Sequence, residues 1–238
     1  MAAAIIVAAG KGRRMAGRVP KQYLDLNGQP VLAHTLKVFD ACDLVETVIL
    51  VVAEDDLDFC RTVILQSLAL TKNVLLTGGG RERQDSVYRG LLCAAEVLDN
   101  PSALVAIHDG VRPLVSAGQV TACIRQAHVS GACILGIPVV DTLKRVDSRG
   151  RISATLARED VWMAQTPQVF RLDLILKAHE AARRCGIVAT DDAELVERQG
   201  VVVDILCGGR QNFKITTVDD LELARSLLPD AGRPLPGV

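Results

Sequence analysis

The sequence has few aromatic residues and no obvious cysteine pairing. Only 3% of its 238 residues are Phe, Trp or Tyr, whereas 49% are hydrophobic, so the core must be aliphatic. Such a core is typical of a sheet that is covered on both faces by helices. The seven cysteines include no C-x-x-C pair, which argues against a disulfide framework and against a zinc site. Scattered cysteines of this kind predict reduced thiols and a cytoplasmic protein.

The chain also lacks a large net charge and the motifs of several enzyme classes. Its 27 basic and 28 acidic residues give a net charge of −1, which offers no indication of a nucleic-acid partner. A G-x-S-x-G elbow, a plausible Cys–His pair and a metal-spaced histidine cluster are all missing from the sequence. The apolar stretch near the N-terminus is too short to cross a membrane, and no charged segment precedes it. We therefore expect a protein without a membrane span or a secretion signal.

Acidic residues are missing from the first 24 positions, where five basic residues occur at 11, 13, 14, 18 and 21. The segment V-A-A-G-K-G-R-R-M at residues 7–15 follows a short apolar run, which predicts a buried strand that leads into a glycine turn. Exposed backbone N–H groups together with Lys and Arg side chains are suited to a polyphosphate. We expect this loop to bind a triphosphate; a solvated turn whose charges only aid solubility is the alternative.

The loop fits neither of two common phosphate-binding patterns. A P-loop requires Ser or Thr after Gly-Lys, and neither residue follows here. The dinucleotide pattern G-x-G-x-x-G begins at Gly10 and Gly12, but its third position is Met15. Arg13 and Arg14 would also hinder the close helix packing that the third glycine permits. A Rossmann-type oxidoreductase is therefore a weaker alternative, and a non-catalytic nucleotide sensor is another.

Short apolar runs rich in β-branched residues alternate with helix-like segments. Strands are expected at residues 5–7, 45–52, 74–76, 104–107, 132–139 and 201–206, and helices at 30–41, 56–68, 86–98, 116–130, 171–185, 191–199 and 218–228. This alternation predicts an α/β fold with a doubly wound, mostly parallel sheet, in a single domain over residues 1–228. Residues 229–238 are rich in Pro and Gly and are expected to form a disordered tail.

One region departs from this alternation. Two strand-like segments, at residues 139–146 and 151–156, flank the turn sequence D-S-R-G and predict a β-hairpin. Its apolar residues are too sparse to bury both faces, so a protruding arm is expected at about residues 138–158. Free strand edges can pair with another chain, which favours a homodimer through this arm. A plain surface ribbon is the alternative.

Ligands of α/β proteins bind beyond the carboxyl ends of the strands, so the residues after each strand are candidates for a site. The glycine-rich segment at 78–86 would let a base or ribose approach its backbone, with Ser86 as a hydroxyl partner, unless it is an ordinary connection. Asp109 follows another strand and is placed for a sugar hydroxyl or for Mg²⁺, while Arg112 suits a substrate phosphate. His108 is more typical of a packed residue than of a catalyst.

The candidates are therefore cations, hydroxyls and one aspartate, without an obvious general base. Such a set suits phosphoryl or nucleotidyl transfer to a nucleophile that is already an anion. A phosphate monoester has a second pKa of about 6 and is largely ionised at neutral pH. It needs positioning and charge neutralisation rather than deprotonation.

Together, the motifs resemble those of the 2-C-methyl-D-erythritol 4-phosphate cytidylyltransferases of the non-mevalonate isoprenoid pathway. The matching segments are A-A-G-K-G-R-R-M at 8–15, P-K-Q-Y at 20–23, G-G-R-E-R-Q-D-S-V at 79–87, H-D-G-V-R-P at 108–113, D-T-L-K-R at 141–145, T-P-Q at 166–168, T-D-D at 190–192 and N-F-K-I-T at 212–216. Their order and spacing cover nearly the whole chain, and they are specific as a set although no single motif is.

The resemblance implies CTP and Mg²⁺, transfer of CMP to 2-C-methyl-D-erythritol 4-phosphate, and a homodimer with interlocked arms. It implies a catalytic set of Arg14, Lys21, Arg158 and Lys214. The sugar-phosphate pocket would be shaped by Asp109, Gly110, Arg112, Thr142, Thr166 and Thr190. CTP would contact Ala8, Ala9, Gly10, Gly12, Gly80 and Ser86. The triphosphate would supply most of the ligands of the metal ion, with Asp109 as the candidate protein ligand.

The resemblance also implies a division of labour between subunits. Thr142 and Arg158 lie on or beside the expected arm, so each would serve the neighbouring subunit's site. A cytidylyltransferase for another polyol phosphate, such as ribitol 5-phosphate, remains the alternative function, because both substrates present a hydroxylated chain and one phosphate.

Overall fold

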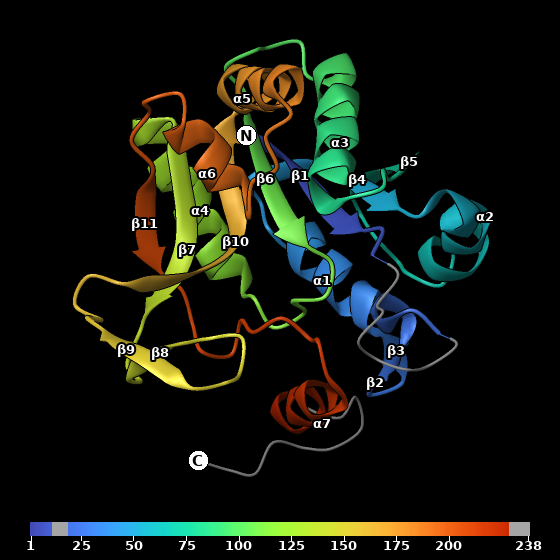
Figure 1. Ribbon diagram of the computed structural model, residues 1–238. Coiled ribbons are helices and arrows are strands. Elements are labelled where there is room, and N and C mark those ends of the chain that lie inside the picture. Colours follow the sequence, from blue (N-terminus) through green and yellow to red (C-terminus); the bar gives the residue numbers. More distant parts are fainter. Residues whose placement is uncertain (11–18, 229–238) are drawn as a thin grey trace.

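The computed structural model describes residues 1–10 and 19–228 (Figure 1). Its centre is a seven-stranded sheet with strand order β11-β7-β10-β6-β1-β4-β5. The strands are β1 (Ala2–Ala8), β4 (Val45–Val52), β5 (Asn73–Gly78), β6 (Leu104–Asp109), β7 (Ala132–Pro138), β10 (Trp162–Arg171) and β11 (Asp204–Cys207). Strand β10 is antiparallel to β6 and β7, whereas the other neighbouring strands pair in parallel. The predicted α/β fold with a mostly parallel sheet is confirmed.

Helices cover both faces of this sheet, as Figure 1 shows. They are α1 (Val31–Asp40), α2 (Leu57–Phe59), α3 (Arg83–Val97), α4 (Ala117–Ser130), α5 (Leu172–Cys185), α6 (Asp192–Glu197) and α7 (Val218–Leu227). Side chains of a strand alternate between its two faces, and β1 follows this rule. Ala4 and Ile6 pack in the core that includes α1 and α4, whereas Ala3 and Ile5 pack in the core that includes α3 and α5. Two aliphatic cores therefore sandwich a central strand, as a doubly wound fold requires.

Strand β10 was not predicted from the sequence. Its residues 165–170 are buried, and its pairing with β7 shifts register between Ala164 and Gln168. Proline cannot donate a ladder hydrogen bond and argues against a central strand. Here Pro167 lies within the irregular stretch, so the strand tolerates it.

The prediction of one regular helix at residues 56–68 is also wrong. The segment consists of a 3₁₀ turn, η2 (Glu54–Asp56), the single turn α2, and the π-helix η3 (Cys60–Leu65). Consecutive β-branched residues at 62–64 restrict side-chain rotamers and weaken a regular helix. The segment still packs on the sheet through the buried Cys60 and Ile64.

Smaller elements lie around the main sheet. Strands β2 (Asp25–Leu26) and β3 (Gln29–Pro30) form a short antiparallel pair, and the 3₁₀ turn η1 spans Lys21–Tyr23. Strands β8 (Leu143–Val146) and β9 (Ile152–Leu156) form a separate antiparallel hairpin, shorter than the strands expected there. Figure 1 shows this hairpin to one side of the seven-stranded sheet. The tail expected at residues 229–238 lies outside the described residues.

A search of the described residues found no helix with the length and apolar character that crossing a membrane requires.

Candidate active site

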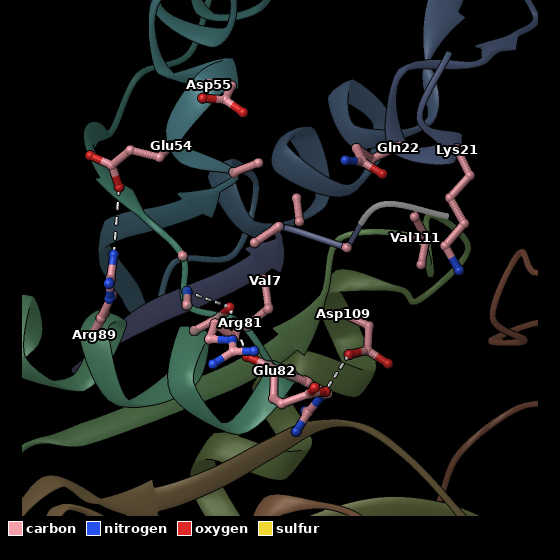
Figure 2. A pocket seen from close by; sticks show the side chains of 18 of the residues that line it. Val7, Lys21, Gln22, Glu54, Asp55, Arg81, Glu82, Arg89, Asp109 and Val111 are labelled. Atoms are coloured by element: carbon pink, nitrogen blue, oxygen red, sulfur yellow. Dashed lines mark hydrogen bonds and ion pairs between the residues drawn. The ribbon is translucent and has the colours of Figure 1, made fainter. Parts of the chain in front are cut away.

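A cavity of about 720 Å³ lies at the carboxyl ends of β1, β4, β5 and β6 (Figure 2). Residues that follow four strands converge there, which is the expected position of a ligand site in a parallel sheet. The cavity is large enough for a nucleotide-sized ligand. Of the candidate residues inferred from the sequence, those that line it are Ala8, Ala9, Gly10, Lys21, Gly80, Ser86, Asp109 and Lys214.

Asp109, the last residue of β6, is the buried anion of this site. Its carboxylate is 3.1 Å from Nε of Arg83, 2.9 Å from Nζ of Lys214 and 3.6 Å from Nε of Arg112. Burial by itself raises the pKa of Asp109, but the three cations outweigh burial and hold that pKa well below its usual range. The carboxylate is therefore ionised at neutral pH and organises the cations around it.

Arg83 was missed as a site residue, although it stands within the R-E-R part of the quoted motif. It opens helix α3, and its guanidinium bridges Asp109 and the fully buried Asp192, whose Oδ2 is 2.8 Å from its Nη1. His179 in turn contacts the other oxygen of Asp192 at 3.1 Å. A cation three residues after the last glycine of the loop was the available signal, but the two partners of Arg83 lie 26 and 109 positions further along the chain.

The segment at residues 212–216 brings one residue of the C-terminal part of the chain, Lys214, to the cavity. Lys214 reaches Asp109, and the carbonyl oxygen of the next residue, Ile215, accepts a hydrogen bond of 3.1 Å from Nζ of Lys21. The Arg112 side chain donates to the carbonyl oxygen of Asn212 at 2.7 Å. This segment therefore brings Lys21, Lys214 and Asp109 together, although they lie far apart in the sequence.

His108 and Thr166 lie behind Asp109 rather than in the cavity. The Asp109 N–H donates to Oγ1 of Thr166 at 3.1 Å, and that oxygen is 3.0 Å from Nδ1 of His108. Nε2 of His108 faces the carbonyl oxygen of Arg112 at 3.2 Å, so the proton is assigned to Nε2. Burial lowers the pKa of His108 to about 4. His108 is therefore a neutral, packed residue at pH 7, as its sequence context favoured.

We expect the neutral burial of His108 to make the protein less stable in mild acid. Unfolding exposes an imidazole with an ordinary pKa near 6.5, so the unfolded state binds the extra proton as pH falls below that value. The free energy of unfolding should fall by about 2 kcal/mol between pH 6.5 and 4.5 from this residue alone. Urea unfolding at both pH values measures the loss, and a His108→Gln variant should show a smaller one. An equal loss in the variant would contradict the assignment.

The glycine loop after β5 is shaped by close backbone packing. A Cβ atom on Gly79 would lie 2.3 Å from Cβ of Ala9, and one on Gly80 would lie 2.2 Å from Cβ of Asp85. The Gly80 N–H donates to Oγ of Ser86, which itself donates to the carbonyl oxygen of Glu82, both at 3.1 Å. Glycine is thus needed where the two loops meet, and Ser86 holds the loop in shape as well as lining the cavity.

Other candidates inferred from the sequence lie away from the cavity. Gly110 donates its N–H to the carbonyl oxygen of Val7 behind the cavity wall. Thr142 and Arg158 are exposed beside the hairpin, and Arg158 donates to the carbonyl oxygen of Val140. Thr190 binds Glu194 just before helix α6. Two more candidates, Arg14 and Gly12, lie outside the described residues.

A metal ion would find few protein ligands here. The described part of the chain contains no group of three or more His, Cys, Asp or Glu side chains placed to hold a metal. Mg²⁺ is commonly bound through one or two carboxylates together with substrate phosphates and water. Asp109 suits that pattern because it is ionised and lines the cavity, so the donor set fits a metal that arrives with a nucleotide.

Comparison with known proteins gives one consistent result. The family model described as 2-C-methyl-D-erythritol 4-phosphate cytidylyltransferase matches residues 2–230. A protein of that name from Pelotomaculum thermopropionicum is 43% identical over 226 residues, which cover 95% of this chain and 93% of the relative. Another from Syntrophus aciditrophicus is 46% identical over 225 residues, or 94% of each chain.

Solved structures agree with these relatives. A 4-diphosphocytidyl-2C-methyl-D-erythritol synthase from Anaerococcus prevotii superimposes with a TM-score of 0.80 at 32% identity, covering 94% of both chains. A 2-C-methyl-D-erythritol 4-phosphate cytidylyltransferase from Francisella tularensis gives a TM-score of 0.79 at 32% identity, covering 95% of this chain and 99% of its own.

Proposed function

Because the chain belongs to the 2-C-methyl-D-erythritol 4-phosphate cytidylyltransferase family, we propose that the reaction takes place in the cavity around Asp109. The enzyme transfers CMP from CTP to 2-C-methyl-D-erythritol 4-phosphate, giving 4-diphosphocytidyl-2-C-methyl-D-erythritol and pyrophosphate for isoprenoid biosynthesis. The observation that supports this location of the active site is that Lys21, Lys214 and the glycine loops converge on one cavity of nucleotide size.

The proposed chemistry is an in-line displacement at phosphorus. An oxygen of the substrate phosphate attacks the α-phosphorus of CTP, and the bond from that phosphorus to the β-phosphate oxygen breaks as pyrophosphate leaves. Lys21, with Arg14, stabilises the charge that develops on the α-phosphate and on the leaving group. Lys214, with Arg158, holds the phosphate of the sugar alcohol for attack. No proton has to be removed from the nucleophile, which agrees with the neutral, buried His108.

The remaining candidates take supporting roles in this proposal. CTP lies over the loop at Ala8, Ala9 and Gly10, continued by Gly12, and against Gly80 and the loop that Ser86 shapes. Gly110, Arg112, Thr142, Thr166 and Thr190 shape the sugar-phosphate pocket, with Arg112 and Thr166 acting through Asp109. The cofactor is Mg²⁺, with Asp109 as its protein ligand; when bound, it neutralises charge on the phosphates.

Pyrophosphate release tests the proposed reaction most directly. Purified protein with CTP and Mg²⁺ should release pyrophosphate with 2-C-methyl-D-erythritol 4-phosphate and not with ribitol 5-phosphate. Release with ribitol 5-phosphate alone would retain the fold and the chemistry but overturn the substrate. Binding of CTP without any release would instead indicate a nucleotide sensor.

We also propose a cytoplasmic homodimer joined through the hairpin. Its strands and the adjoining start of β10 leave several large apolar side chains exposed in the single chain, namely Val140, Val146, Ile152, Leu156, Val161, Trp162 and Met163. Exposed apolar side chains gathered in one segment of the chain favour a protein partner. Arg158 and Thr142 do not line the cavity of their own chain, which supports their contribution to a partner's site. All seven cysteines are free thiols, in keeping with a reducing compartment.

Mixed dimers test the shared site. Lys21→Ala and Arg158→Ala should each be nearly inactive alone, because every site then lacks one cation. If the two residues of a site come from different chains, a heterodimer has one intact site. Equal mixing after dissociation should then restore about a quarter of the wild-type sites, since half of the dimers are mixed. Activity that stays at the level of the single variants would contradict a shared site.

A further inference from the structure

Gln22 is a largely buried residue that lines the wall of the cavity. The residue is only 2% exposed, yet it lines the cavity, and Figure 2 shows it at the wall beside Lys21. Its amide has two donor hydrogens and an acceptor oxygen. Within the described residues, no group forms a hydrogen bond with that amide. In a cavity wall, such an amide can donate hydrogen bonds to a ligand that occupies the cavity.

The backbone around Gln22 is held firmly on both sides. On one side, Nζ of Lys21 donates to the carbonyl oxygen of Ile215 at 3.1 Å. On the other side, the Tyr23 hydroxyl donates to Oδ2 of Asp56 at 3.0 Å, and the Tyr23 ring meets Phe59 edge-on at 5.1 Å. The turn is therefore anchored to two separate parts of the fold. Because its two neighbours are anchored, the backbone position of Gln22 is fixed before a ligand binds, which reduces the entropy lost on binding.

The residues around Gln22 indicate which chemical group of a ligand its amide would bind. Gln22 adjoins the cation proposed to face the triphosphate, and the same wall includes Ala8, Ala9 and Gly10 at the end of β1. An amide can donate to a phosphate oxygen without adding charge, whereas a carboxylate at this position would repel it. The side chain therefore has the donor chemistry that an anion beside Lys21 requires.

We infer that the Gln22 amide is a binding group for the triphosphate of CTP, donating a hydrogen bond to a phosphate oxygen next to Lys21. This inference rests on the proposed position of CTP in the cavity. It adds a neutral donor to a set otherwise composed of cations and backbone N–H groups.

Two near-isosteric variants test the inference through nucleotide affinity. Gln22→Met removes the donor and should weaken CTP binding on the order of 10-fold, the loss typical of a hydrogen bond to a charged group. Gln22→Glu adds a negative charge and should weaken it further, on the order of 100-fold. Gln66→Glu, at an exposed position after η3, is the matched control and should bind CTP like the wild type. Isothermal titration of each folded variant with CTP, and then with cytidine, measures these effects.

The two ligands separate a phosphate contact from other contacts. The inference expects the variants to lose affinity for CTP while binding cytidine as the wild type does, with an unchanged KM for the sugar phosphate. Because the amide has no partner in the described protein, Gln22→Met should also keep the wild-type melting temperature. Unchanged CTP affinity in both variants would overturn the inference, as would an equal loss for cytidine. Failure of the wild type to release pyrophosphate would instead contradict the proposed reaction, whatever these titrations show.

Discussion

Lys21→Ala is expected to lower kcat by ~10²–10³-fold, the loss seen when an enzyme gives up one preorganised group that stabilises charge in the transition state. Lys21 lines the cavity, and its ammonium is held in place by the carbonyl oxygen of Ile215 at 3.1 Å. Because the proposed charge develops only as pyrophosphate leaves, the effect should fall mainly on kcat.

Steady-state pyrophosphate release measures both kinetic constants for this variant. Lys177→Ala removes an exposed lysine of helix α5, away from the cavity, and should keep the wild-type values. Circular dichroism and thermal unfolding verify that the Lys21→Ala protein is folded. A wild-type kcat with a raised KM alone would show that Lys21 binds the ground state and the transition state equally, which would contradict its proposed role.

Asp109→Asn is expected to destabilise the protein by roughly 3 kcal/mol, because removing one partner of a buried ion pair leaves the other charges uncompensated. Asp109 contacts Arg83, Arg112 and Lys214, and Asp192 is the other carboxylate that contacts this group, through Arg83. The figure is moderated by partial exposure of Lys214, whose side chain is 35% exposed. Urea unfolding at pH 7 measures the difference in the free energy of unfolding.

A surface pair provides the matched control for this substitution. Asp58 pairs with Arg61 at 3.0 Å, but both side chains are exposed, so Asp58→Asn should change stability by less than about 1 kcal/mol. Equal losses of unfolding free energy in the two variants would contradict the view that burial makes the Asp109 ion pairs important for stability.

The stability of the wild type at acid pH should also depend on the Asp109 carboxylate. The pKa of Asp109 is depressed in the folded state, so its contribution to stability is present above its unfolded pKa near 4 and is lost as pH falls below that value. Asp109→Asn should therefore show a shallower loss of stability below pH 4 than the wild type. This window lies below that of His108, so the two contributions can be measured separately.

The sequence alone determined the α/β class and every strand of the main sheet except β10. These features are local, because apolar runs rich in β-branched residues define strands. Strand β4 has the predicted bounds, Val45–Val52, because β-branched residues dominate this run. The order and spacing of the motifs also identified the family, which the comparison with known proteins confirmed.

Tertiary structure alone decided the antiparallel place of β10 and the contacts that organise the site. Pro167 made β10 a poor strand by local rules, yet pairing with β6 and β7 buries its residues 165–170. Arg83 acquires its role only where Asp109 and Asp192 come within ion-pairing distance, and Gln22 only where its turn closes the cavity wall. Electrostatic contacts and unpaired polar groups depend on distances between remote segments, and no local pattern of residues encodes those distances.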